Sequence, residues 1–528
     1  MIRPTTILCA LLLIVASCQN TGRLKEQLPV QPENTAHLKN TPLALDPILL
    51  QNVPEVVKEF YAANGNVTLW TTQDDRKALQ QTIADVENDG LLPDDYSLTF
   101  LKEFETLTAI SEQDCMRYDL MLTEAFTSVT NHLFKGRLKP DGVYTDWALT
   151  PKKLDTNKLL TEALQNHNVT EVIDRCRPRH KIYGSLRKSL AYLNTLPNDN
   201  TINSIVIVKP ITLNDSTSTV HSIKQRLAYW QDLDSIYLND NVYNAATAVA
   251  VKKFQERHGI VADGVVNSRT AQALNFSRNQ RKEQVIANLE RWRWFPYDFG
   301  ERAIVINIPD YGLAIVENNK DTIQTYKVVV GKPDRRTPVL QSTLSNLIIN
   351  PTWTVPPTIL KEDLTPTATK DRNHFIDLNM KIYLNNAEVS PWEWDPEKAT
   401  SYRYVQGPGN HNALGRIKFN FQNNFSVYLH DTNHKENFAK PYRALSSGCV
   451  RVQNPFKLAG YVLEKQEAGW TKDKIDEILE TGETTNVDIK KSIRVHQLYW
   501  TAWMDKDGLQ FRNDIYSLDK ILYAKLRS

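Results

Sequence analysis

The sequence predicts a multidomain α+β protein with a helical N-terminal part, a small helical unit and a β-rich C-terminal part. Over residues 45–215, apolar residues recur mainly at helical spacing. A compact three-helix pattern follows over 218–277. From 285 to 528, runs such as RAIVINIP alternate with Asp, Asn, Gly and Pro, which is typical of strands and turns. A chain of 528 residues is long enough to build a core for each part.

The composition is that of an ordinary globular protein. Charged residues make up 23% of the chain and hydrophobic residues 41%. The formal net charge is only +2, so no broad basic surface is expected and nucleic acid is not predicted as a partner. Motifs therefore have to carry the functional prediction.

The first eighteen residues, MIRPTTILCALLLIVASC, have the features of a targeting segment. Arg3 supplies a positive start, and the apolar run 7–15 is too short to span a bilayer as a helix. The final VASC resembles a bacterial lipobox, in which Cys18 receives lipid; the alternative is an ordinary signal peptide with a chance cysteine. We therefore expect residues 19–44 to tether a periplasmic protein, held only by lipid to the membrane facing the cell wall, by default the outer membrane.

Export changes the meaning of the five cysteines. Cys9 leaves with the signal and Cys18 is the lipidation site, so Cys115, Cys176 and Cys449 remain. An oxidising compartment favours pairing, and three is an odd number. Cys115 and Cys176 fall in one predicted helical region, which leaves a disulfide between them open. Cys449 is then the leftover thiol.

The helical region 45–215 is predicted to be a packing scaffold, because it contains no chemical motif. In TTQDDRKALQQTIADVENDG, for example, Leu79, Ile83 and Val86 follow helical spacing and the helix closes at Gly90.

The unit at 218–277 contains the motif AVKKFQERHGIVADGVVNSRTAQAL. Its central helix is expected to begin at the N-cap Asn244, to bury Val249 and Phe254, and to stop at Gly259. The motif resembles the peptidoglycan-binding module of cell-wall hydrolases, and this resemblance implies peptidoglycan as a partner. The alternative is a generic three-helix bundle.

The β-rich region is interrupted by a polar stretch at about 360–415 that has little β character and contains PWEWDPEKATSYRY. A long insertion in a β domain is usually a lid or binding loop, or else disordered. Its tryptophans and tyrosines favour the ordered alternative.

The short segment LSSGCVRV places Cys449 behind a turn of small residues. A free thiol has a pKa near ~8.5 and needs a base or a cation to become a good nucleophile. His430 ends the alternating run 425–430, and a returning loop could bring its imidazole to the sulfur. The backbone or side chain of Asp431 is the nearest group that could orient the ring. The alternative for both residues is a packed thiol and a structural histidine.

The turn itself suggests an oxyanion site. Ser447 and Gly448 are small, so substrate can approach the backbone closely, and the N–H groups of Gly448 and Cys449 could hold an oxyanion. Arg451 could pin the loop, favour the thiolate or meet a substrate carboxylate. A zinc site at HDTNH is not predicted, because His430 ends a strand and the motif has Asp in place of the required Glu.

The HDT at 430–432, together with SSGCVRV, resembles the active-site signature of L,D-transpeptidases with a YkuD-type catalytic domain. These cysteine enzymes cross-link bacterial peptidoglycan. Further matches, together with the helical and wall-binding parts, resemble the large multidomain subfamily that has a capping insertion: RWRWFP, VVVGKPDRRTPV, NPTWTVPPTI and YWTAWMDKDGLQFRNDIY. Many shorter members have Gly and His where this chain has Asp431 and Ser447.

The resemblance implies a two-step acyl transfer. Cys449 attacks the bond between diaminopimelate and D-alanine of a donor tetrapeptide stem, His430 protonates the leaving D-alanine, and an acceptor stem amine resolves the thioester to a 3→3 cross-link. The implied partners are peptidoglycan stems and other cell-wall synthesis enzymes, and carbapenems are the implied inhibitors. No metal or organic cofactor is implied, and the capping insertion would fold over the donor stem.

Several residues are candidate substrate contacts, with core packing as the alternative: Arg451, Trp353, Tyr428, Tyr442 and Arg443. Two rival functions stay open. An L,D-carboxypeptidase would use the same site to deliver the thioester to water, and a non-catalytic lipoprotein would only bind the wall.

Overall fold

The structure is a computed structural model that describes residues 35–318, 321–466 and 469–528. The chain divides into two compact units, which are described separately. Unit 1 comprises residues up to 87, 92–130 and 155–174, and unit 2 comprises 88–91, 131–154 and 175–528. Among the described residues, no helix is long and apolar enough to cross a membrane. The predicted signal segment and the lipidation site Cys18 lie outside the described residues.

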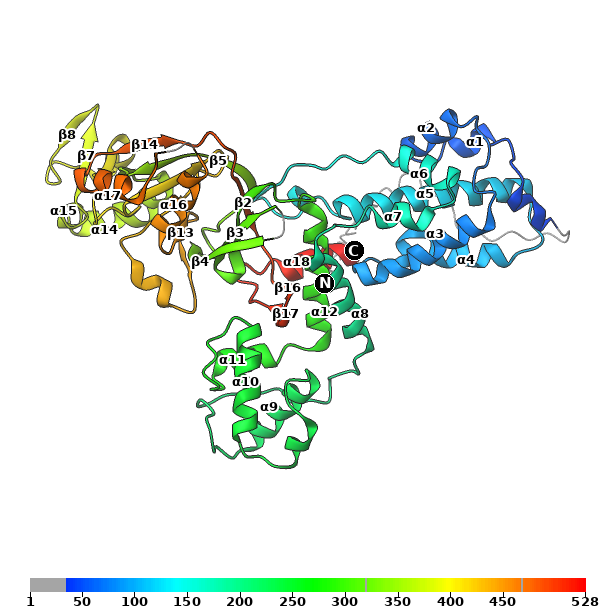
Figure 1. The fold of residues 1–528 in the computed structure, drawn as a ribbon, viewed down its shortest axis with the longest axis horizontal. Coiled ribbons are helices and arrows are strands. Elements are labelled where there is room, and N and C mark those ends of the chain that lie inside the picture. Colours follow the sequence, from blue (N-terminus) through cyan, green and yellow to red (C-terminus); the bar gives the residue numbers. More distant parts are fainter. Residues whose placement is uncertain (1–34, 319–320, 467–468) are drawn as a thin grey trace, which may run out of the picture. The chain divides into compact units, whose positions relative to one another are not determined.

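Unit 1 is helical, as predicted, with Leu79 and Ile83 fully buried in its core. Its helices, drawn in blue to cyan in Figure 1, are α1 (Pro47–Leu50), α2 (Glu55–Ala63), α3 (Gln73–Asp85), α4 (Leu98–Thr106), most of α5 (Glu112–Lys135), α6 (Thr156–Gln165) and α7 (Val169–Asp174). The predicted tether is shorter than expected. Lys39 donates to the carbonyls of Phe104, Glu105 and Leu107 at the end of α4, so residues 35–44 belong to unit 1.

Unit 2 begins its helical part with α8 (Lys181–Thr195) and contains the predicted three-helix unit, α9 (Ser218–Tyr229), α10 (Ala245–Arg257) and α11 (Ser268–Leu274). Asn244 caps α10 by accepting from the N–H of Thr247, and Gly259 follows the helix with a φ of +61°. Phe254 is buried, but the prediction for Val249 was wrong, because its side chain is 66% exposed. Helical spacing alone places Val249 only one residue from the buried face.

The main sheet of unit 2 closes into a barrel-like ring. Its strands are β2 (Arg302–Asn307), β3 (Gly312–Glu317), β4 (Asp321–Gly331), β5 (Val339–Ile349), β10 (Ile417–Phe421), β11 (Leu429–His430), β13 (Val450–Val452) and β15 (Arg494–Leu498). They pair in the order β5-β10-β11-β13-β4-β3-β2-β15, and β15 pairs again with β5. Closure removes free edges from these strands. The flanking strands are β1 (Trp147–Ala148), β12 (Ala444–Ser446) and β14 (Thr485–Asp488).

The predicted insertion is ordered and forms a cap with its own core, drawn in yellow-green to yellow in Figure 1. It contains more β structure than expected. A separate sheet in the order β6-β9-β7-β8 is made by β6 (Trp353–Thr354), β7 (Met380–Leu384), β8 (Ala387–Val389) and β9 (Arg403–Gln406). The short helices are α13 (Pro357–Ile359), α14 (Thr365–Lys370) and α15 (Asn373–Asp377), with a turn of π-helix, η7 (Leu360–Leu364), between α13 and α14. Trp394 is buried and donates to the Tyr404 hydroxyl at 2.7 Å.

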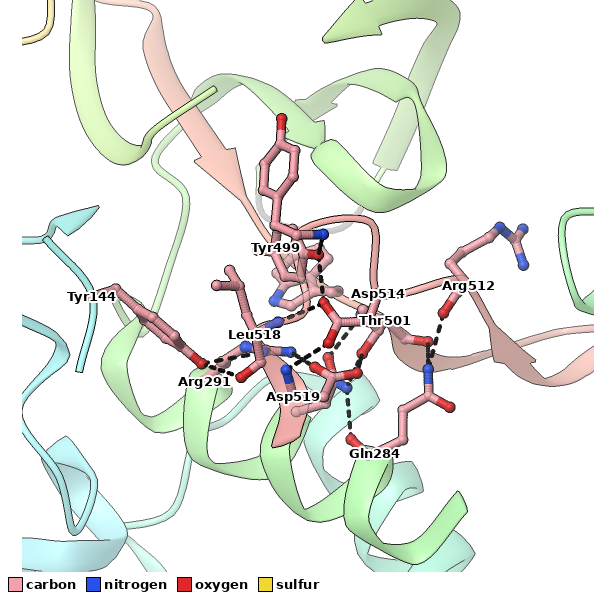
Figure 2. A network of polar contacts seen from close by, with 12 residues as sticks. Tyr144, Gln284, Arg291, Tyr499, Thr501, Arg512, Asp514, Leu518 and Asp519 are labelled. Atoms are coloured by element: carbon pink, nitrogen blue, oxygen red, sulfur yellow. Dashed lines mark hydrogen bonds and ion pairs between the residues drawn. The ribbon is translucent and has the colours of Figure 1, made fainter. Parts of the chain in front are cut away.

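A buried polar network joins the long helix α12 (Arg278–Trp294) to the C-terminal helix α18 (Asp519–Arg527) (Figure 2). Arg291 pairs with Asp519, which also accepts from the Thr501 hydroxyl at 2.8 Å. Gln284 donates to the carbonyls of Thr501 and Arg512. The network fixes α12, from the middle of the chain, against the C-terminal helix. The remaining elements are α16 (Pro455–Glu464), α17 (Lys472–Thr481), and the hairpin β16 (Ala502–Asp505) and β17 (Gly508–Phe511).

The possible disulfide between Cys115 and Cys176 does not form: both lie in the described part of the chain, both are buried, and no disulfide joins them. Cys115 is on α5 of unit 1, whereas Cys176 belongs to unit 2. Proximity along the sequence within one helical region therefore did not predict pairing.

Candidate active site

The register of two parallel strands brings the predicted thiol and imidazole to one face of the sheet. Leu429 on β11 pairs with Val450 on β13, and His430 pairs with Arg451. Leu429 and Val450 are fully buried in the main core. Because side chains alternate along a strand, His430 and Arg451 point away from that core, and Cys449, one residue before Val450, lies on their face.

The thiol of Cys449 is held by Tyr428. Burial raises the pKa of Cys449 above its ordinary value, and hydrogen bonds from the main-chain N–H and the hydroxyl of Tyr428 oppose this rise, as do the charges of Lys418 and Arg451. Trp353 in turn hydrogen-bonds to the Tyr428 hydroxyl. Of these two predicted substrate contacts, Tyr428 therefore lies at the sulfur and Trp353 lies behind it. At neutral pH the sulfur rests as a thiol.

Lys418 is a site residue that the sequence analysis missed. It pairs with His430 across β10 and β11, and its Nζ lies 4.0 Å from the centre of the Tyr428 ring. Burial lowers its pKa, and the charge of Cys449 opposes that shift. The sequence does contain a signal that could have identified Lys418. It is a lone lysine in the alternating run IKFNF, where Ile417 and Phe419 are fully buried. Lys418 and Arg451 together make the face electropositive, which favours a thiolate when one forms.

His430 is buried and uncharged at neutral pH. Burial, with a further contribution from the positive charge of Arg451, lowers its pKa to about 3, while the backbone groups of Asp431 and Leu414 act in the opposite direction. The ring lies edge-on to Tyr428, with 5.6 Å between ring centres. Its Nδ1 has no hydrogen-bond partner among the described residues. A neutral imidazole can accept a proton from the thiol.

The carboxylate of Asp431 holds a turn rather than the ring. Its Oδ2 accepts from the N–H of Arg416 at 3.0 Å. A Cβ at Gly415, whose φ is +61°, would lie 2.3 Å from the same oxygen, so only glycine fits there. Leu414 precedes this glycine. Asp431 therefore fixes the turn that brings the Leu414 backbone toward His430, and its carboxylate makes no hydrogen bond to the ring in the described structure.

The loop before Cys449 is tightly bonded. Gly448 has a φ of +110°, and its carbonyl accepts from the Thr337 hydroxyl at 2.8 Å. Its N–H donates to Oγ of Ser446 at 3.2 Å, and this hydroxyl donates to the carbonyl of Cys449 at 2.6 Å. The Gly448 amide, which was expected to help hold an oxyanion, is therefore already engaged by Ser446. The Cys449 amide has no such bond among the described residues.

Arg335, in the loop after β4, connects the exposed Ser447 to the cap. It donates to the Ser447 hydroxyl at 3.0 Å, to Glu362 at 2.9 Å and to Asp363 at 3.0 Å. Both acids lie on η7. Although the acids are half exposed, the Arg335 side chain is only 10% exposed. One guanidinium therefore contacts both the cysteine loop and the cap.

Tyr442 and Arg443, the other two predicted substrate contacts, face a different environment. Tyr442 is 43% exposed and packs edge-on against Tyr311. Arg443 donates to the carbonyls of Val328 and Lys440. The contacts described for these two residues involve neither Cys449 nor His430.

Three parts of the chain match known families. The family model described as the L,D-transpeptidase catalytic domain, YkuD, matches residues 301–489. A second, described as a "Putative peptidoglycan binding domain", matches 216–274, and a scaffold domain matches 55–190. The first match contains the whole face built around Cys449.

A protein of Haemophilus influenzae named "Putative L,D-transpeptidase" is 36% identical over 242 residues. The match covers 45% of this chain and 48% of that protein, so the chain spans about half the length of the relative.

Among the solved structures that match, two are 14% identical to this chain. An L,D-transpeptidase from Stackebrandtia nassauensis has a TM-score of 0.19 and a fused Zn-dependent amidase/peptidase/peptidoglycan-binding protein from Clostridium acetobutylicum one of 0.15. Each match covers 55% of this chain, with 96% and 99% of those chains respectively, and at such scores neither contributes to the argument. From the matched domains, the chain contains a YkuD-family L,D-transpeptidase catalytic domain together with a peptidoglycan-binding domain.

Proposed function

We propose that the chain is an L,D-transpeptidase that forms 3→3 cross-links in peptidoglycan. Cys449 attacks the carbonyl that joins the L-centre of diaminopimelate to the terminal D-alanine. The thiol proton passes to His430 and then to the departing amine of D-alanine, which leaves a thioester. The side-chain amine of a second stem attacks this thioester, its proton passes through His430 to the sulfur, and the free thiol returns.

The observation that carries the proposal is the common face of Cys449 and His430 on neighbouring strands, inside a domain that matches the catalytic family. His430 is uncharged at neutral pH because burial lowers its pKa, so it can act as the base. Arg451 and Lys418 would stabilise the thiolate as it forms, and the Cys449 amide would hold the oxyanion. The cap would exclude water, which favours the amine over hydrolysis.

The test is to incubate the purified chain with disaccharide-tetrapeptides and to identify the products by mass spectrometry. Cross-linked dimers with released D-alanine are expected, and Cys449→Ala should abolish them. Cys115→Ala, which removes a buried thiol in unit 1, is the matched control and should keep activity. Tripeptide monomers alone would identify an L,D-carboxypeptidase instead. A carbapenem should acylate Cys449, and an adduct on another residue would contradict the site.

We also propose that the chain is a periplasmic lipoprotein anchored through Cys18, working beside other cell-wall synthesis enzymes. The proposal is supported by the lipobox-like VASC and by the peptidoglycan-binding domain. Cys18→Ser should move the protein from the membrane fraction to the soluble periplasmic fraction. Unchanged fractionation would contradict the anchor.

A further inference from the structure

A large groove lies on the outer face of β2, β3 and β4, and its lining includes neither Cys449 nor His430. Its volume is about 1260 Å³. Small-molecule sites usually measure roughly 300–1,000 Å³. The walls come from residues 179–182 at the start of α8, from 297–299, and from Trp503 on β16. The groove has room for an elongated ligand.

The floor of the groove is made of small and polar residues in register. Ala314 on β3 pairs with Val305 and with Thr325, and Gly312 pairs with Asn307 and Lys327. Because β2, β3 and β4 are each paired on both sides, the floor offers no free strand edge. An extended peptide therefore cannot bind here by adding a strand, and recognition must come from side chains.

Aromatic side chains make up part of the lining. Tyr297 and Trp503 are partly exposed, whereas Trp292, Trp500 and Tyr311 are 1%, 7% and 6% exposed. Rings that stay accessible beside a groove can pack against the faces of sugar rings.

The charged groups of the lining favour an anion. Four cations contribute: Arg179, Lys181, Lys327 and Arg443. Of the two acids, Asp310 is paired with Arg512 and Asp298 lies 4.0 Å from Arg494. Neither Lys181 nor Lys327 forms an ion pair with any residue that the structure describes. The groove therefore has uncompensated positive charge.

We propose that this groove binds the glycan strand of peptidoglycan, an amino-sugar oligosaccharide that carries carboxylates. The accessible aromatic rings suit the faces of sugar rings, and the cations suit the carboxylates. The identity of the polymer rests on the proposed function. The groove shares no lining residue with α9, α10 or α11, so it is a second wall-binding site beside the peptidoglycan-binding domain.

The groove also has a chain connection to the thiol. Arg443 lines the groove and immediately precedes β12, which leads into the Cys449 loop. Its guanidinium lies 5.1 Å from the centre of the ring of Tyr311, another residue of the lining. A glycan bound here would keep its stems close to the catalytic face. Arg443 would then contact the glycan rather than the donor stem.

The test uses the full chain and a stem-free oligosaccharide of alternating N-acetylglucosamine and N-acetylmuramic acid with a photoreactive group. Because this probe has no scissile peptide bond, its binding is independent of turnover at Cys449. Cross-links are expected in segments 297–316 and 322–327. Ala314→Trp, which fills the floor, should lower affinity at these segments at least ten-fold, and Lys327→Glu should do so without adding bulk.

The matched control is Ile323→Trp on β4, because Ile323 is 43% exposed and lies outside the lining. It should bind like the unmodified chain, and melting temperatures should show that each variant is folded. Cross-links confined to 216–274, equal affinity in all variants, or binding of a free stem peptide instead of the glycan would each overturn the proposal. Loss of turnover in Cys449→Ala with unchanged glycan binding would separate the two sites.

Discussion

The polar network between α12 and α18 is buried and the polar cluster around Cys449 is half-buried, and the two differ in how their charges are paired. In the network, Arg291 is paired with Asp519, which also accepts from Thr501 (Figure 2). In the cluster, Lys418 and Arg451 form no ion pair with any described residue. The paired charge of the network holds two helices together, whereas the two cations of the cluster remain able to act on a thiolate or a substrate.

The largest expected effect is on the chemistry of the cluster. His430→Gln should lower the rate of thioester formation about 10²–10⁴-fold, because the base is lost. Stability should change little, since Nδ1 makes no hydrogen bond in the described structure. Stopped-flow acylation by a carbapenem measures the rate, and urea unfolding measures the stability.

His496→Gln is the matched control, because His496 is also buried, with burial lowering its pKa to about 4. Its Nε2 is 3.0 Å from the carbonyl oxygen of Phe299, so this variant should lose stability while the folded protein keeps its rate. Equal rate losses in the two variants would mean that His430 is not the base.

The second-largest effect concerns the network, where a substitution should lower stability and leave the rate unchanged. Arg291→Met should lower the free energy of unfolding by about 3–5 kcal/mol, because it leaves Asp519 buried without its partner. The acylation rate of the folded fraction should not change. Urea titration checks the stability. Lys381→Met, which removes an exposed ion pair with Glu388, should cost under ~1 kcal/mol.

The third effect concerns the contact between cap and cysteine loop. Arg335→Ala removes the bonds to Ser447, Glu362 and Asp363, so the cap should open and admit water. We expect the ratio of hydrolysed to cross-linked product to rise about 10-fold, measured by mass spectrometry. Arg336→Ala is the neighbouring control, because Arg336 is exposed and, in the described part of the chain, its side chain donates only to the carbonyl of Pro333. The same ratio in both variants would remove Arg335 from this role.

The sequence predicted the site where local patterns determine it. The alternation that ends at His430 and the small-residue turn at Cys449 are local features, and the strands place them on one face. Lys418 was missed because its position depends on the register between β10 and β11, which the chain does not encode within one segment. The Arg335 contact was missed for the same reason, since its acids lie 27 and 28 residues away.

In the fold, too, local features were predictable from the sequence and long-range pairings were not. Helix caps such as Asn244 were predictable from neighbouring residues, whereas the sheet of the cap depends on pairings between segments that are weakly patterned on their own. The engaged amide of Gly448 was also unpredictable, because Ser446 could equally have faced solvent. Long-range pairing and side-chain choice set these features, and neither has a local signature.

The smallest expected effect is the part of the pH dependence of stability that His430 contributes. The pKa of His430 is about 3 in the folded chain and about 6.5 when unfolded. Between these values the unfolded chain binds a proton that the folded chain does not, so stability is full above pH 6.5 and falls as the pH drops toward 3. From pH 7.5 to 5.5, His430→Gln should lose roughly 1 kcal/mol less than the unmodified chain in urea unfolding. His434→Gln should keep the full loss because His434 is 60% exposed, and equal slopes for all three proteins would mean that His430 is charged in the folded state.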